Sequence, residues 1–212
     1  MMYRSGDEAA ARAARPSGTV PATTNQALAA LLSRHSLGPR WMVAPGPSEA
    51  ELALAIQAAL RAPNHGRLQP WRAITVGTDQ RPALAALFEE FARESGKSED
   101  EVAIERERAF NGPVLLAWVA RIDTTVDKVP PHEQWICVGG AFANFMNAVH
   151  SMGYGAKILS GRKCQHQAIV RAFCAEGEQL VGFICIGTPT RALEPREEDR
   201  PHDVLSAWEP SR

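Results

Sequence analysis

The sequence has few cysteines, almost no excess charge and no long apolar run. Its four cysteines include no CxxC pair, so their spacing indicates neither a zinc site nor a redox pair and favours free thiols in a reducing compartment. The formal net charge of −1 gives no overall basic field that would attract nucleic acid or a membrane surface. The longest apolar run, Pro113 to Ala120, is far too short to span a bilayer. We therefore expect a cytoplasmic protein whose partners include neither nucleic acid nor a membrane.

Several catalytic and metal-binding signatures are also missing. The six histidines show no HExxH or other ligand spacing, and there is neither a GxSxG elbow nor a Walker loop. The stretch GYGAKILSG, residues 153–161, precedes a predicted strand, whereas a dinucleotide-binding loop follows one. The spacing leaves a Cys–His nucleophile open, although the apolar surroundings of the cysteines favour inert thiols. The sequence therefore assigns no metal ligand and no catalytic side chain.

What the sequence does contain fits one globular domain. It has 212 residues, of which 45% are apolar and 22% charged, enough for a sizeable core. Residues 1–24 lack an apolar stripe and are expected to form a disordered tail. Residues 25–212 are expected to form the folded domain. Within it, the segment from Thr188 carries prolines and many charges and should wrap the surface.

Apolar periodicity and turn residues predict helices and strands that intermix along the chain. Ser48 with Glu51, and Ser98 with Glu101, have the spacing of capping boxes that open helices. The apolar run 113–120 is typical of a strand buried on both faces. Because the elements show no regular βαβ spacing, we expect an α+β fold. The predicted helices cover about 25–34, 48–62, 84–91, 101–110, 132–152 and 165–173, and the predicted strands 71–76, 113–120, 156–161 and 180–187.

Two of these helices carry details that bear on packing. Leu60 is expected on the buried side of the helix that Pro63 ends. Gly139 and Gly140 lie in the middle of the long helix that starts near His132, where two adjacent glycines together cost roughly 2 kcal/mol. Either another backbone or a flat ligand approaches them closely, or the pair is a tolerated weak spot in a strongly apolar helix.

Three polar sets interrupt the apolar framework. If they converge, they supply guanidinium groups, imidazoles, a hydroxyl, an amide and backbone N–H groups, which together suit a phosphate and a polar heteroaromatic ring. Taken singly, each residue also has a structural explanation, such as neutralising a helix end or bonding local backbone. The sets are Arg34, His35 and Ser36; Arg61, His65 and Gln69; and the turn Ile158, Leu159, Ser160 and Gly161.

Five motifs occur in the order found in a known family. They are RHS at 34–36, APNHGRLQPW at 62–71, KVPPHEQW at 128–135, GYGAKILSG at 153–161 and VGFICIGTP at 181–189. Over about residues 25–190 the chain resembles the FMN-dependent nitroreductases, in particular their small, YdjA-type branch. Relatives often have Arg where this chain has His35 and Leu159.

The resemblance implies a fold, a cofactor and an assembly. The fold would be an α+β three-layer sandwich with a mostly antiparallel central sheet flanked by helices. The assembly would be an intertwined homodimer with FMN at the subunit interface, where Gly139 and Gly140 let the partner come close. The residues implied to bind FMN are Arg34, His35, Ser36, Arg61, His65, Gln69, Ile158, Leu159, Ser160 and Gly161.

The activity implied by the resemblance is that of an FMN-dependent oxidoreductase. It would use NAD(P)H for ping-pong reduction of a small-molecule acceptor such as a nitroaromatic compound, a quinone or an enone, and the flavin would carry the chemistry without a catalytic side chain. Two alternatives stay open at this point. One is a flavin-using dehydrogenase or flavin-fragmenting enzyme of the same fold, and the other is a non-catalytic flavin-binding or regulatory protein.

Overall fold

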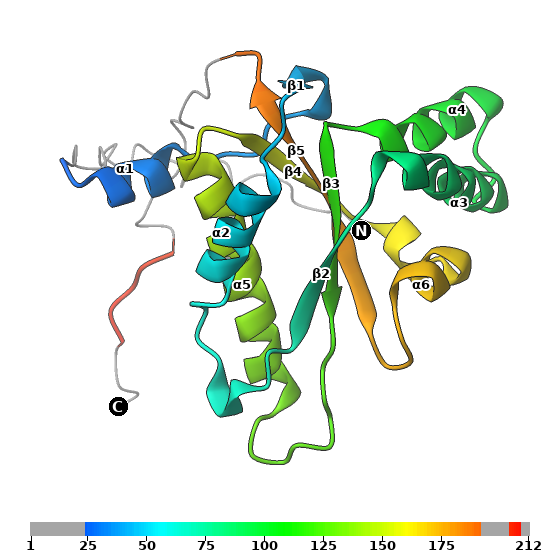
Figure 1. The fold of residues 1–212 in the computed structure, drawn as a ribbon. Helices are drawn as coiled ribbons and strands as arrows, with labels where there is room; N and C mark the ends of the chain where they lie inside the picture. The colour runs from blue at the N-terminus through cyan, green and yellow to red at the C-terminus, as the bar shows by residue number, and fades with distance from the viewer. Residues whose placement is uncertain (1–23, 192–203, 209–212) are drawn as a thin grey trace, which may run out of the picture.

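The computed structural model describes residues 24–191 and 204–208. The predicted disordered tail, apart from Thr24, lies outside these residues, and so does most of the C-terminal segment that was expected to wrap the surface. The described helices and strands form an α+β structure built around one sheet (Figure 1). None of the helices in these ranges is both long enough and apolar enough to cross a membrane.

All strand pairs of the central sheet are antiparallel. Strand β5 is the longest strand and pairs with β1, β3 and β4, and β2 pairs with the other edge of β3. Strand β5 continues past the predicted end at Gly187, because Thr188 and Pro189 pair with β1, a two-residue strand that the sequence did not predict. The strands are β1 Met42–Val43, β2 Trp71–Thr75, β3 Val114–Ala120, β4 Gly155–Leu159 and β5 Gln179–Pro189.

Strand β3 shows how the sheet separates two cores. Leu115, Ala117 and Val119 pack into one cluster of buried residues, whereas Leu116 and Trp118 pack into the other. Because successive side chains of a strand point to opposite faces, both faces of β3 are buried, as its sequence predicts. The structure is therefore a three-layer sandwich, and the predicted fold class is confirmed.

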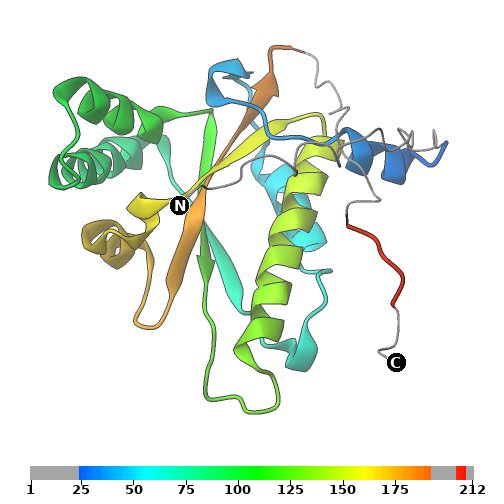
Figure 2. The same ribbon diagram turned by 180° about the vertical axis from the view of Figure 1, so that it is seen from behind.

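Different helices cover the two faces (Figures 1 and 2). On one face, α2 Glu49–Ala59 packs against the long α5 Pro131–Ser151, and α1 Gln26–Ser33 lies against α5 near its end. The other face carries α3 Arg81–Glu94, α4 Glu99–Glu107 and α6 Gln167–Phe173. Short 3-10 turns complete the described chain: η1 Pro39–Trp41, η2 His65–Arg67, η3 Thr78–Gln80, η4 Arg108–Phe110 and η5 Arg162–Gln165.

Both predicted capping boxes are present. The Ser48 side chain accepts a hydrogen bond from the Glu51 N–H (3.3 Å), and the Glu51 carboxylate accepts one from the Ser48 N–H (2.8 Å). Ser98 and Glu101 make the same reciprocal pair at the start of α4. Each box satisfies two backbone donors that a helix start leaves unpaired, so α2 and α4 begin where the sequence indicates.

Two packing details differ from the sequence predictions. Leu60 directly follows the last residue of α2 and is 42% exposed, because its neighbours Ala59 and Ala62 are the residues that enter the core at this end of α2. A Cβ added at Gly140 would lie 3.4 Å from the Cβ of Ala62. The segment that closely approaches this glycine is therefore the one directly after α2 in the same chain, where a partner subunit was expected. Gly139 faces open space.

Candidate functional site

The first predicted polar set lies where α1 ends. The Asn25 side chain caps the start of this helix by accepting a hydrogen bond from the Leu28 N–H (3.1 Å). At the other end, Arg34 adopts an extended conformation and terminates the helix. Arg34 and His35 are half-buried and Ser36 is exposed, so all three can be reached from solvent at a helix C-terminus. An anion bound here must be held by side chains, because the helix dipole is negative at this end.

A histidine of α5 joins this set. The Ser33 hydroxyl donates to the Ala30 carbonyl (3.2 Å), which leaves Ser33 Oγ to accept from the Nε2–H of His150 (3.0 Å). Burial lowers the pKa of His150, and the charge of Arg34 and the neighbouring His35 lower it further. We call Arg34, His35 and His150 the basic cluster. A bound anion would offset the repulsion among these groups.

Sequence reasoning missed His150. Its position in the last turn of an apolar helix is as consistent with simple packing as with binding. The signal lies in the pairing of α1 with the end of α5, which joins residues more than 100 positions apart in the chain. Only the folded chain shows that pairing.

The third predicted set lies close to the first, because the segment after α1 runs beside β4. The Leu37 N–H donates to the Ala156 carbonyl (3.1 Å). A Cβ on Gly155 would lie 2.5 Å from Leu37 Cδ2, so this approach requires glycine at position 155. Leu37 is fully buried, which fixes the residues that precede it against the strand. Ile158 follows two residues after the contact at Ala156, and the two polar sets therefore share one region.

The turn after β4 presents backbone to solvent. The side chain of Ile158 packs toward the α2–α5 core and that of Leu159 toward the α3 core. Neither side chain is therefore available to bind a ligand through polar contacts. Ser160 and Gly161 are exposed, and Gly161 has φ +104°, a conformation that L side chains rarely adopt. Among the described residues, the N–H groups of Ser160 and Gly161 have no hydrogen-bond acceptor. They are available to a ligand.

The second predicted set lies on the tight connection between α2 and β2. His65 Nδ1–H donates to Glu133 Oε2 at the start of α5 (2.6 Å), and both side chains are partly exposed. Gln69 interacts through its backbone: its N–H donates to Asn64 Oδ1 (3.4 Å), and its carbonyl accepts from Arg121 Nε (3.0 Å). Arg61 at the end of α2 is exposed.

This connection is held in an unusual backbone conformation. Gly66, Arg67 and Gln69 all have positive φ, at 69°, 55° and 48°. Two of these are not glycine, and such backbone strain is uncommon outside turns that the surroundings fix. The side chains of Asn64 and Arg121 both bond to the backbone of Gln69, which has one of these positive φ angles. Asn64 therefore has a structural role in the connection between α2 and β2.

Within one chain the three sets do not meet. His150 beside the first set and Glu133 beside the second lie at opposite ends of α5. Their separation of 17 positions corresponds to about 25 Å along a helix that rises 1.5 Å per residue. Figures 1 and 2 show the same arrangement from two sides, with α1 at one end of α5 and the connection after α2 at the other. The predicted convergence would require a second copy of the chain.

The helices near these sets expose large apolar side chains. Leu31 and Leu32 on α1 are each 50% exposed, and on α5 Ile136 is 62% exposed and Trp135 39%. Leu54 and Leu60 add to this surface on and after α2. Exposed apolar groups on three neighbouring helices are typical of a face that another protein surface covers.

The cysteines behave as packing residues. Cys137, Cys164 and Cys185 are buried and Cys174 is half-buried, and all four are free thiols. Burial raises the pKa of Cys164 and of Cys185 to about 11. Both thiols are therefore protonated near neutral pH, which argues against their use as nucleophiles.

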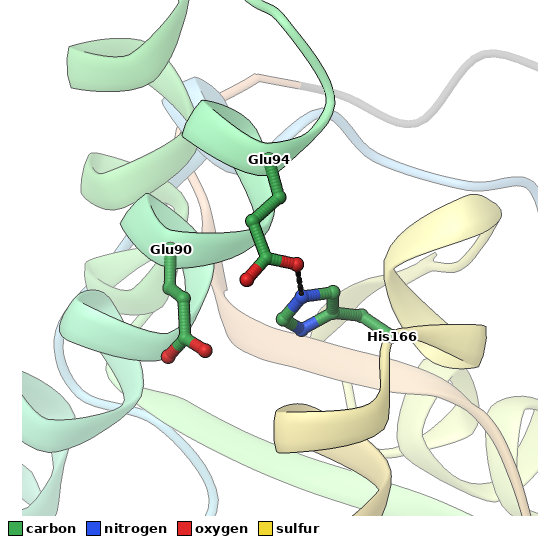
Figure 3. A group of neighbouring side chains, drawn as sticks. All are labelled: Glu90, Glu94 and His166. Carbon is green, nitrogen blue, oxygen red and sulfur yellow. Dashed lines mark hydrogen bonds and ion pairs between the residues drawn. The ribbon is translucent and has the colours of Figure 1, made fainter.

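One group of side chains away from these sets has metal-ligand character. The ligand atoms of Glu90, Glu94 and His166 lie within 4.8 Å of one another (Figure 3). Glu90 and Glu94 are exposed on α3, and Glu94 accepts a hydrogen bond from His166 Nε2 (2.8 Å). Because that bond already uses the exposed ring nitrogen of His166, the group forms an ion-pair contact between α3 and the start of α6.

Comparisons with known proteins identify a family for this architecture. The model of the nitroreductase family matches residues 32–188. A Haemophilus influenzae protein named as a provisional NAD(P)H nitroreductase is 30% identical over 154 residues, which cover 72% of this chain and 84% of that protein. An Escherichia coli K12 protein, provisionally named NAD(P)H nitroreductase YdjA, is 29% identical over 77% of this chain and 88% of its own length.

Solved structures show the same fold. A nitroreductase-like protein from Bacillus cereus superposes with a TM-score of 0.73, covering 90% of this chain and all of that one, at 18% identity. The Vibrio harveyi NADPH:FMN oxidoreductase, solved with NAD+, superposes with a TM-score of 0.66 over 89% of this chain and 79% of that one, at 17% identity.

Proposed function

The chain belongs to the nitroreductase family, and from this premise we propose that it is an FMN-dependent oxidoreductase that takes electrons from NAD(P)H. The observation that carries the proposal is the hydrogen bond between Leu37 and Ala156, because it brings the basic cluster and the turn after β4 into one region. The same region then offers cations for a phosphate and free N–H donors for a polar ring.

The residues present fit FMN. The basic cluster of Arg34, His35 and His150 suits a phosphate, since Arg34 supplies a permanent positive charge and the two imidazoles supply further hydrogen-bond donors. The pKa of His150 is lowered first by burial and then by the charge of Arg34, and a bound anion would oppose both effects. The N–H groups of Ser160 and Gly161 suit the acceptor atoms of the isoalloxazine ring. The Ser36 hydroxyl would bind the same phosphate next to Arg34, and the packed side chains of Ile158 and Leu159 would set the position of the turn.

The remaining predicted residues would act from a second copy. Arg61, His65 and Gln69 lie at the far end of α5 and are assigned to the flavin bound mainly by the partner. His65 would be held for this role by its bond to Glu133. The exposed apolar side chains of α1, α2 and α5 support a homodimer that buries them. Residues 25–212 would form the FMN-binding domain, and its location would be the cytoplasm.

Bound FMN would supply hydride transfer in a ping-pong reaction, with NAD(P)H as the donor and a nitroaromatic, quinone or enone as the acceptor. The chain's own residues bind and orient. A positive charge from Arg61 at an electron-rich edge would stabilise the reduced state relative to the oxidised one. No described side chain is required to move a proton.

Two observations test this function. The purified protein is expected to be yellow and to release FMN on denaturation. Under anaerobic conditions, NADPH or NADH is expected to bleach the flavin within seconds, and a quinone should restore the colour. A protein that holds FMN but is not bleached by either nucleotide would support a non-catalytic flavin-binding role, and a colourless protein that does not take up FMN would contradict both.

We expect Arg34→Ala to weaken FMN binding more than His35→Ala at neutral pH. The guanidinium is fully charged and can bind phosphate with two donors, whereas a neutral imidazole offers one. The difference should be about 1–2 kcal/mol, the gap between a charge-assisted and a neutral hydrogen bond. Titration of the two apoproteins with FMN measures it, with the exposed Arg171→Ala as a control. Equal losses for the two variants would show that Arg34 does not face the phosphate.

A further inference from the structure

A second basic region lies beside the proposed flavin site, and none of the residues that line it is assigned to FMN. It is an open cleft of about 680 Å³ between η1, α4 and β4. This volume is within the range of about 300–1,000 Å³ that is usual for small-molecule sites. Gly38 at its rim follows the first polar set in sequence, and Lys157 on its wall precedes Ile158. The cleft is therefore next to the region assigned to FMN.

The lining of this cleft is strongly positive. Arg40, Arg108, Lys157 and Arg191 line it together with a single carboxylate, that of Glu107. Among the described residues, only Arg108 of the four cations pairs with a carboxylate. The whole chain has a formal net charge of −1, so this concentration of positive charge is local.

An aromatic ring sits among these cations. The guanidinium carbons of Arg40 and Arg191 lie 5.1 and 5.0 Å from the centre of the Trp41 ring. The Thr190 N–H donates to the Trp41 carbonyl (2.9 Å), which ties the residue before Arg191 to the ring that Arg191 approaches. The half-buried indole thus holds two guanidinium groups near each other, and this pair of cations suits a phosphate of a nucleotide.

A second cavity connects the cleft with the flavin turn. A neighbouring cavity of about 430 Å³ shares Arg108 with the cleft and reaches Ser160; its charged lining also includes Lys97, Glu101, Glu105, Arg162 and Lys163. Ser160 belongs to the turn whose free N–H groups were assigned to the isoalloxazine ring. A nucleotide whose phosphate binds beside Trp41 can thus extend along this second cavity toward the flavin.

We propose that the cleft binds the 2′-phosphate of the nicotinamide nucleotide, so that the electron donor is NADPH in preference to NADH. The inference rests on the proposed function. The two nucleotides differ only in this phosphate, a dianion, and Arg40, Lys157 and Arg191 are the cations that have no described carboxylate to neutralise them. Arginine is well suited to a phosphate monoester because its planar fork of donors matches the phosphate oxygens.

Binding of nucleotide fragments to the FMN-loaded protein tests the inference without turnover. Calorimetry is expected to give about tenfold tighter binding for 2′,5′-ADP than for 5′-AMP, as for the loss of one charge-assisted contact. Arg40→Gln, Lys157→Gln and Arg191→Gln should each reduce this preference, whereas the control Arg171→Gln on α6 should keep it. In anaerobic mixing, the ratio of flavin reduction rates with NADPH and NADH should fall in the same three variants.

The alternatives give different results. Equal affinity for the two fragments, in a protein whose flavin is bleached by NADH, would overturn the inference and leave the proposed function intact. If 2′,5′-ADP binds only the FMN-free protein and competes with FMN, the cleft holds the flavin phosphate and the assignment to the donor is wrong. A protein that prefers 2′,5′-ADP but takes up no FMN would keep the phosphate site and contradict the proposed function.

Discussion

Replacing Glu105 with alanine is expected to lower the free energy of unfolding by about 3–5 kcal/mol, the usual loss when one partner of a buried ion pair is removed. Glu105 is 1% exposed, and its carboxylate accepts from Lys97 Nζ (2.7 Å), from Arg108 (2.7 Å) and from Lys163. Lys163 is itself 4% exposed and lies over the Phe88 ring. Without the carboxylate, its ammonium group would be buried among apolar atoms.

Urea unfolding of the variant and the parent measures this loss. Glu107→Ala is a matched control, because Glu107 is an exposed residue of the same helix with no ion pair to another described residue. Its effect should stay within about 0.5 kcal/mol. The double substitution Glu105→Met with Lys163→Met should recover much of the stability, since it removes both buried charges together. A loss for Glu105→Ala as small as that of the control would contradict the account of this network.

The pH dependence of the same variant has a defined sign. Burial raises the pKa of Glu105, but the hydrogen bonds from Lys163 and Lys97 more than reverse this and hold the pKa at about 2, below the usual 4.5. A pKa that is lower in the folded state contributes stability above about pH 4.5, and this contribution is lost as the pH falls toward 2. The difference in stability between parent and Glu105→Ala should therefore shrink from pH 6 to pH 3.

The network also bears on the proposed site. Lys163 follows Gly161 by two residues and lies in the 3-10 turn that starts after it. Its bond to Glu105 on α4 anchors one side of the turn that presents the free N–H groups. A partial loss of FMN affinity in Glu105→Ala is expected on this ground, in proportion to the movement of the turn.

Local sequence patterns predicted most of the fold. The capping boxes at Ser48 and Ser98, the buried strand β3 and the long helix α5 depend on residues within a few positions of each other, and all are present. Strand β1 was missed because it has two residues and exists only through its pairing with the end of β5.

Contacts between distant residues could not be predicted in the same way. Glu105 and Lys163 are 58 positions apart. In the sequence alone, Glu105 has the pattern of an ordinary charge on a helix surface, and Lys163 that of an ordinary charge in a turn. His150 joins the first polar set through a bond to Ser33, 117 positions away. The residue types of the candidate site were visible in the sequence, but their division between two ends of α5 was not, since it depends on how α5 packs between α1 and the connection after α2.

This division is the central claim of the account: the basic cluster and the turn after β4 come from one copy, and Arg61 with His65 from the other. Arg34→Glu and Arg61→Glu should each lower the FMN affinity of a homodimer by about 100-fold, because each places a carboxylate where a cation faces the cofactor. Arg171→Glu, on exposed α6, should bind FMN like the parent. Each variant should unfold at nearly the parent's urea concentration, since both arginines lie at the ends of helices and have no buried charge to leave unpaired.

A mixed dimer of the two variants tests the claim directly. It is obtained by co-expression with two different tags and purified through both. If each site takes Arg34 from one copy and Arg61 from the other, one site in the mixed dimer carries both substitutions and the other carries neither. The mixed dimer should then bind one FMN per dimer with the affinity of the parent. If both residues serve the same site from one chain, every site carries one substitution, and no FMN would bind with the parent's affinity.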